Sequence, residues 1–85
     1  MNLLVLTPEK EIFKGKVTSV QVPGISGKFE ILNNHAPIVS ALTKGKVRII
    51  IEGGEKKSFE IKKGFIEVLK NDVSLLVQGV TEKKL

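Results

Sequence analysis

Alternation between apolar and polar residues, with a period of two, most limits what this chain can form. The pattern runs through residues 45–52, 57–62 and 72–78. Period two is typical of half-buried β-strands, whereas a helix places apolar residues every three to four positions. No window of the sequence supports a long amphipathic helix. The residues predicted to point inward are Val47, Ile49, Ile51, Phe59, Ile61, Val73, Leu75 and Val77.

Turn residues separate the predicted strands. The pairs Gly53-Gly54 and Asn71-Asp72 each predict a two-residue hairpin loop, because both tolerate the left-handed backbone of primed turns. A third loop lies between Pro23-Gly24 and Ser26-Gly27, and Pro37 opens a further strand. The predicted fold is therefore all-β, a small β-sandwich or flattened barrel of about eight to ten short, mainly antiparallel strands.

Some apolar residues fall on the face of a predicted strand that alternation leaves outside. A second apolar face needs either a second sheet or a partner to cover it. The pattern alone leaves both interpretations open. These residues are Ile50, Ile66, Val68 and Leu76.

The composition describes an ordinary small globular chain, predicted to form a single domain over residues 1–85. The net charge is +5, but the lysines are scattered in pairs, so they form either solvated faces or a surface for a polyanion. A nucleic-acid or polyanion-binding β-barrel is thus one alternative, although the absence of Tyr and Trp leaves few surfaces for base stacking. Residues 1–10 do not have the form of a secretory signal, and no stretch is long enough to span a membrane.

No group of residues predicts catalysis or metal binding. His35 is the only histidine and the chain has no cysteine, so His35 makes a poor metal site. Asp72 falls in a turn, and Glu9 and Glu11 are predicted to face solvent. A general base needs a partner group and a pocket, and the sequence indicates neither. The prediction is a non-enzyme without a cofactor or metal.

Three segments, taken in order, carry a resemblance to a known family. They are "LLVLTPEKEIFKGKVTSVQVPG", "SGKFEILNNHAPIVSALTKGKVRI" and "IKKGFIEVLKNDVSLLVQGV". Together they resemble the N-terminal β-sandwich domain of the epsilon subunit of bacterial F-type ATP synthases, called delta in mitochondria. The His-Ala-Pro motif, followed by Gly45 and Arg48, is the specific part of the match.

The chain departs from the family pattern at two places. Where many members read "GELGILPGHAPL", this chain reads "GKFEILNNHAPI". Lys28 therefore replaces an acidic residue, which implies a changed charge on the partner, while Asn33 and Asn34 replace Pro and Gly and still tolerate turn geometry. The sequence stops at "GVTEKKL", where many members continue into a helical hairpin. We therefore expect no C-terminal helical domain and assign no nucleotide binding or hairpin-based inhibition.

The resemblance implies a non-catalytic central-stalk (rotor) subunit that couples gamma to the membrane c-ring during proton-driven ATP synthesis. Such a subunit lies peripherally at the cytoplasmic face of the bacterial inner membrane and binds no nucleic acid. From the residues alone, His35 is either a turn histidine bonded within its own loop or an interface residue. By matching position, the gamma-facing residues are Thr7, His35, Val39 and Ser40, and the loop toward the c-ring contains Ser26, Gly27 and Lys28.

Overall fold

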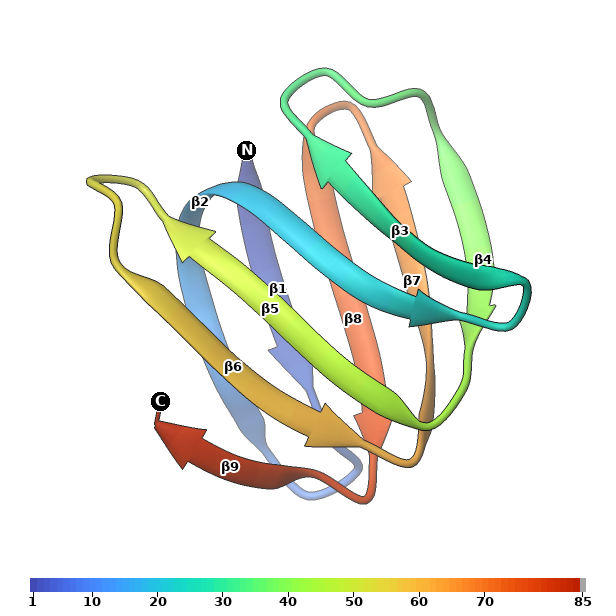
Figure 1. Cartoon of the computed structure of the whole chain (residues 1–85). Helices are drawn as coiled ribbons and strands as arrows, with labels where there is room; N and C mark the ends of the chain where they lie inside the picture. Colours follow the sequence, from blue (N-terminus) through green and yellow to red (C-terminus); the bar gives the residue numbers. More distant parts are fainter. Residues whose placement is uncertain (85) are drawn as a thin grey trace.

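The chain folds into β-strands joined by short turns (Figure 1). The computed structural model describes the backbone of residues 1–84 and the side chains of residues 1–81. That part of the chain contains no helix long and apolar enough to cross a membrane. Its nine strands are β1 (Asn2–Leu6), β2 (Glu11–Gly24), β3 (Gly27–Leu32), β4 (Ile38–Leu42), β5 (Gly45–Ile51), β6 (Lys56–Ile61), β7 (Lys63–Leu69), β8 (Asp72–Gln78) and β9 (Thr81–Lys84).

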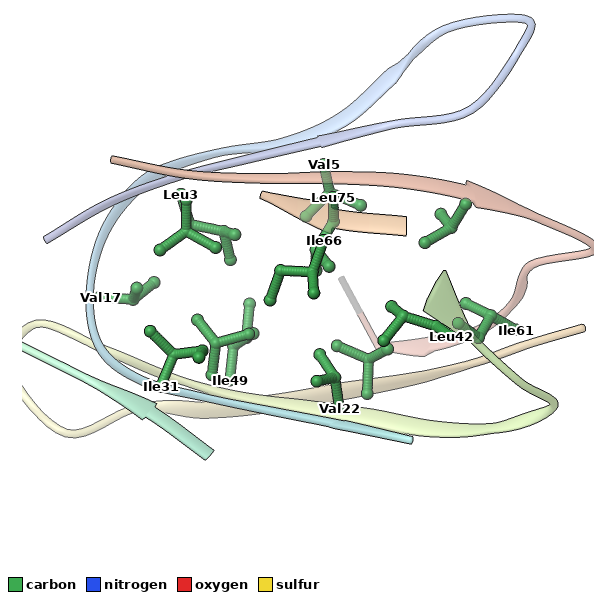
Figure 2. Packing of buried hydrophobic residues seen from close by; sticks show 14 of the residues in the cluster. Leu3, Val5, Val17, Val22, Ile31, Leu42, Ile49, Ile61, Ile66 and Leu75 are labelled. Carbon is green, nitrogen blue, oxygen red and sulfur yellow. The ribbon is translucent and has the colours of Figure 1, made fainter. Parts of the chain in front are cut away.

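The long strand β2 makes two layers out of one hydrogen-bonded sheet. Its first part pairs with β1, and its second part pairs with both β3 and β5. The first layer therefore contains β4, β7, β8, β1 and the start of β2, and the second contains β3, the end of β2, β5, β6 and β9. Figure 2 shows β2 bending between the layers beside Val17. The β1–β8 pair is parallel and the other described pairs are antiparallel, so the predicted β-sandwich is confirmed.

The core lies between the layers, and Ser19 is the one buried polar residue among the described side chains. Leu3, Val5, Ile66 and Leu75 approach it from the first layer and Ile49 from the second (Figure 2). Full burial of such a side chain contributes roughly 1.5–3 kcal/mol relative to exposure. The inward residues predicted for β5, β6 and β8 are confirmed, since each is buried except the half-buried Ile51.

The prediction for β7 was wrong. Ile66 and Val68 were assigned to the outer face, but they are buried, with 0% and 2% of their surface exposed. Phe65 and Leu69 instead point outward, with 57% and 52% exposed. Phe65 and Leu69 share their set of alternating residues with the charged Lys63 and Glu67, whereas the set that contains Ile66 and Val68 has no charged residue and is the one that the structure buries. The predictions for Ile50 and Leu76, half-buried and exposed respectively, were correct.

Two turns differ slightly from their predicted form. In the β7–β8 hairpin Leu69 pairs with Asp72, so the turn residues are Lys70 and Asn71, one position earlier than predicted. In the β5–β6 hairpin the N–H of Ile51 bonds to the carbonyl of Glu55 at 2.7 Å, which closes a three-residue loop. The glycine pair still supplies the positive φ angles of this loop.

Candidate partner-binding surface

The described part of the chain does not bring metal-ligating side chains together. Among the described residues, no three His, Asp or Glu side chains lie close enough to hold a metal ion. Of the four phenylalanines only Phe65 is exposed, so no aromatic row is available for stacking bases. The nucleic-acid alternative is therefore not favoured. What the surface does offer is a set of exposed apolar side chains on the first layer.

Strand register creates an apolar row across the outer face of the first layer. Ala41 pairs with Phe65, Phe65 pairs with Leu76, and Leu76 pairs with Leu6. These four residues come from β4, β7, β8 and β1, which lie side by side in Figure 1. Residues directly opposite each other in a sheet present their side chains on the same face. The row is thus continuous, although its members are far apart in sequence.

A groove lies along this row and is lined by all four of its residues. It has a volume of about 530 Å³, and its lining includes Leu6, Thr7, Pro8, Phe65 and Leu76. Phe65 and Leu76 leave 57% and 52% of their surface exposed beside it. We call it the apolar groove. Exposed apolar surface of this kind on a small domain marks a site where another molecule packs.

Val39 adds an exposed apolar side chain to the same face, two residues before Ala41 on β4. It pairs with Glu67, next to the Ala41–Phe65 pair, and 72% of its surface is exposed. No described side chain covers it. Because successive residues of a strand point to opposite sides, Ser40 lies on the other side of β4 from Val39. Ser40 is half-buried, and its hydroxyl donates to the carbonyl of Ala41 at 3.3 Å.

Thr7 stands at the end of the apolar groove and shapes the β1–β2 turn. Its backbone N–H donates to the carbonyl of Lys10 at 2.8 Å. Its Oγ1 accepts hydrogen bonds from the N–H groups of Glu9 and Lys10, at 3.3 and 3.1 Å. A hydroxyl that bonds nearby backbone groups in this way stabilises a turn. Thr7 also lines the apolar groove, so it lies beside the exposed face of the first layer.

His35 lies in the connection between β3 and β4. Its backbone N–H donates to the carbonyl of Leu32 at 3.1 Å, and its Nδ1 lies 2.7 Å from the carbonyl of Ala36. A carbonyl can only accept, so Nδ1 carries the proton in this geometry. The imidazole is thus bonded within its own loop, as one of the two sequence interpretations expected. That bond fixes the ring at the start of the segment that leads to Val39.

The β2–β3 hairpin turn carries the other predicted group. Ser26, Gly27 and Lys28 are all exposed, and Gly27 has a φ of +127° that favours glycine. Gly24 packs the base of the turn, since a Cβ there would lie 2.6 Å from the Gly27 carbonyl oxygen. The conformation of the turn therefore depends on Gly24 and Gly27, and residues 25–28 at its tip are exposed.

A second groove joins this turn to β4. It has a volume of about 380 Å³ and is lined by Gly24, Ile25, Ser26, Gly27, Lys28, Phe29, Ser40 and Ala41. Ser40, expected to face one partner, and the turn residues, expected to face another, thus share one groove. The structure keeps Thr7 apart, since it lines the apolar groove at the end of β1.

Sequence reasoning missed four residues of this surface. Leu6, Phe65 and Leu76 line the apolar groove, and Ile25 exposes 69% of its surface at the tip of the β2–β3 turn. Leu76 had been recognised as an outward apolar residue, but without a place in a site. An isoleucine between two glycines of a predicted turn was the available signal for Ile25, because such positions are normally polar.

The fold and sequence both match a known family. The family described as the β-sandwich domain of the ATP synthase delta/epsilon chain matches residues 1–83. The ATP synthase epsilon chain of Chlorobium limicola is 44% identical over 80 residues, which cover 94% of this chain and 91% of that protein. The epsilon chain of Leptospira borgpetersenii is 48% identical over 77 residues, covering 89% of this chain but only 59% of the longer relative.

Solved structures show the same fold at lower identity. A chain in the cryo-EM structure of the Euglena gracilis mitochondrial ATP synthase, which contains OSCP, F1 and the c-ring, matches 94% of this chain and 51% of its own length. Its TM-score is 0.88 and its identity 23%. A chain in the central stalk and c-ring structure of the Tetrahymena thermophila mitochondrial enzyme has a TM-score of 0.82 at 20% identity. It matches 96% of this chain and 66% of its own length.

Proposed function

The chain belongs to the β-sandwich family of ATP synthase delta and epsilon chains, and on that basis we propose that it couples gamma to the c-ring. In this role it is a non-catalytic subunit of the central stalk. It holds two rotating parts in register, so that torque passes between proton flow and ATP synthesis. As part of the membrane-associated F1 sector, it lies at the cytoplasmic face of the bacterial inner membrane.

The observation that carries the proposal is the uncovered apolar face of the first layer. Val39, Phe65 and Leu76 expose 72%, 57% and 52% of their surface on one side of a small domain. A free-standing protein gains nothing from such a surface, whereas a permanent subunit buries it against a neighbour. Gamma is the proposed neighbour on this face, through the predicted residues Thr7, His35 and Val39 together with the apolar groove. Ser40, also predicted to face gamma, lies on the other side of β4, in the groove beside the β2–β3 turn.

The c-ring is the proposed partner of the β2–β3 turn. Ser26, Gly27 and Lys28 form the exposed end of that hairpin, and Ile25 adds an apolar tip. A short turn held by glycines suits contact with the polar loops of a ring, because it is rigid and protrudes from the sandwich. Lys28 supplies a positive charge here, so the matching position of the ring in the same organism should be acidic.

The test is association with the gamma subunit of the same ATP synthase. Val39→Asp should raise the dissociation constant by about thirtyfold or more, as expected for a buried interface anchor worth about 2 kcal/mol. Leu32→Asp is the matched control, since Leu32 exposes 52% of its surface on β3 in the other layer. Calorimetry at moderate and high salt separates apolar docking from charge attraction. If both variants bind gamma as the unmodified chain does, the proposed interface is wrong.

A further inference from the structure

One end of the sandwich concentrates backbone geometry that most residues avoid. Asn34, Lys70 and Asn71 have φ angles of 64°, 50° and 65°, and they are the only non-glycine residues with positive φ in the described part of the chain. Figure 1 shows the β3–β4 connection and the β7–β8 turn together at this end, near the N-terminus. Left-handed geometry costs little for asparagine, whose side chain bonds locally.

The side chain of Asn71 connects the two turns. Its Oδ1 accepts a hydrogen bond from the backbone N–H of Asn34 at 2.9 Å. Its Nδ2 donates to Oδ1 of Asn33 at 3.3 Å. The backbone carbonyl of Asn71 accepts from the N–H of Asn2 at 3.1 Å. We call these three bonds the Asn71 clasp, since one residue fastens β1, the β7–β8 turn and the β3–β4 connection.

The β3–β4 connection has few other fixed points. Between the end of β3 and the start of β4 its backbone bonds within itself from His35 to Leu32, at 3.1 Å. Its tip is tied to the rest of the sandwich at two residues. The N-terminal amine of Met1 donates to Oδ1 of Asn33 at 2.9 Å, and the bond from Asn34 to Asn71 is the one that holds the backbone of the tip. The connection also decides how the chain enters β4, and hence where Val39 stands on the outer face.

We propose that Asn71 is a positioning residue for gamma binding. It holds residues 33–37 in the shape that the partner contacts, so that this ordering is complete before association. Loops that are already ordered bind more tightly, because the entropy of fixing them is not lost on binding. This inference rests on the proposed function, in which the segment from His35 to Val39 faces gamma, and it concerns a residue that lies outside that segment.

Asn71→Gly is the decisive variant. Glycine keeps the positive φ of 65° without strain and removes the side chain that makes both amide bonds. We expect the dissociation constant for gamma to rise about tenfold, as for one loop that must be ordered on binding. The amide hydrogen of Asn34 should also exchange faster in the free chain. Lys70→Gly is the matched control, because it alters the same turn and leaves the clasp intact, so neither quantity should change.

Asn71→Asp separates positioning from stability. A carboxylate still accepts the Asn34 N–H but can no longer donate to Asn33. Gamma affinity should therefore lie between those of the unmodified chain and Asn71→Gly, whatever happens to the melting temperature. If Asn71→Gly exchanges faster at Asn34 but binds gamma with unchanged affinity, the positioning role is refuted and the proposed function stands. If the unmodified chain fails to bind gamma, both fail.

Discussion

Phe65 on β7 and Leu76 on β8 stand directly opposite each other, and each exposes more than half of its surface on the outside of the first layer, 57% and 52%. They form the centre of the apolar row and line the apolar groove. A cross-strand pair of this kind inside a sandwich would be covered by the second sheet. Here nothing in the described chain covers it, which makes the pair the natural centre of an interface.

Leu76→Ser therefore tests the interface at its centre. We expect association with gamma to weaken by about 2 kcal/mol, because a central apolar anchor is lost. The stability of the free chain should change by no more than about 0.5 kcal/mol, since the side chain is already half exposed. Calorimetry measures the first quantity and urea denaturation the second.

Leu32→Ser is its matched control. Leu32 is the same residue type with the same exposure, 52%, but it lies on β3 in the second layer. It should leave gamma affinity unchanged. Equal losses in the two leucine variants would mean that the effect is not specific to the first layer, and the assignment of that layer to gamma would have to be abandoned.

The charge of Lys28 gives a prediction about the other partner. Lys28 is exposed, and the one ion pair found among the described side chains joins Lys57 to Glu55 instead. Lys28→Glu should weaken binding to the c-ring of the same organism by about three- to tenfold at low salt. The difference should shrink as salt rises, because exposed charges are screened. Binding assays with detergent-solubilised c-ring over a salt series measure both effects.

Lys56→Glu controls for net charge in that series. Lys56 is also exposed, but it begins β6, away from the β2–β3 turn. It should change ring binding little. Tighter ring binding by Lys28→Glu would show that the ring is basic at this position, and the inferred inversion of charge would be wrong.

Regular alternation made much of the fold predictable. In β8 the inward set Val73, Leu75 and Val77 is apolar and the residues between them are mostly polar, so one assignment is clearly favoured. In β7 the sequence "FIEVL" has large apolar residues in both alternating sets, although one set also contains Glu67, so the signal is weaker than in β8. The register of β7 with β4 and β8 turns Ile66 into the core and leaves Phe65 outside.

The candidate surface was harder to predict than the strands. The resemblance supplied Thr7, His35 and Val39 as positions, but the apolar groove depends on four strands meeting in one register. Leu6 and Leu76 become neighbours only through the parallel β1–β8 pair, which joins the two ends of the chain. The bond between Asn71 and Asn34 likewise spans 37 residues. Local patterns carry no information about such contacts.

Gly24→Ala tests whether the β2–β3 turn is as closely determined as its packing indicates. An added Cβ would lie 2.6 Å from the carbonyl oxygen of Gly27 and 2.7 Å from the ring of Phe29. The Gly27 carbonyl is part of the backbone and cannot move without opening the hairpin, so we expect a loss of about 1–3 kcal/mol in the free energy of unfolding. Urea denaturation measures it.

Gly15→Ala is the control for Gly24→Ala, because its Cβ would meet only the far end of the Phe13 ring, at 3.3 Å. It should cost clearly less, since a side-chain end can shift by a few tenths of an ångström. The turn variant should also weaken ring binding beyond its effect on stability, because Lys28 moves with the turn. A Gly24→Ala chain as stable as the unmodified one would mean that the hairpin rearranges at little cost, and the turn would then not hold Lys28 in a fixed place.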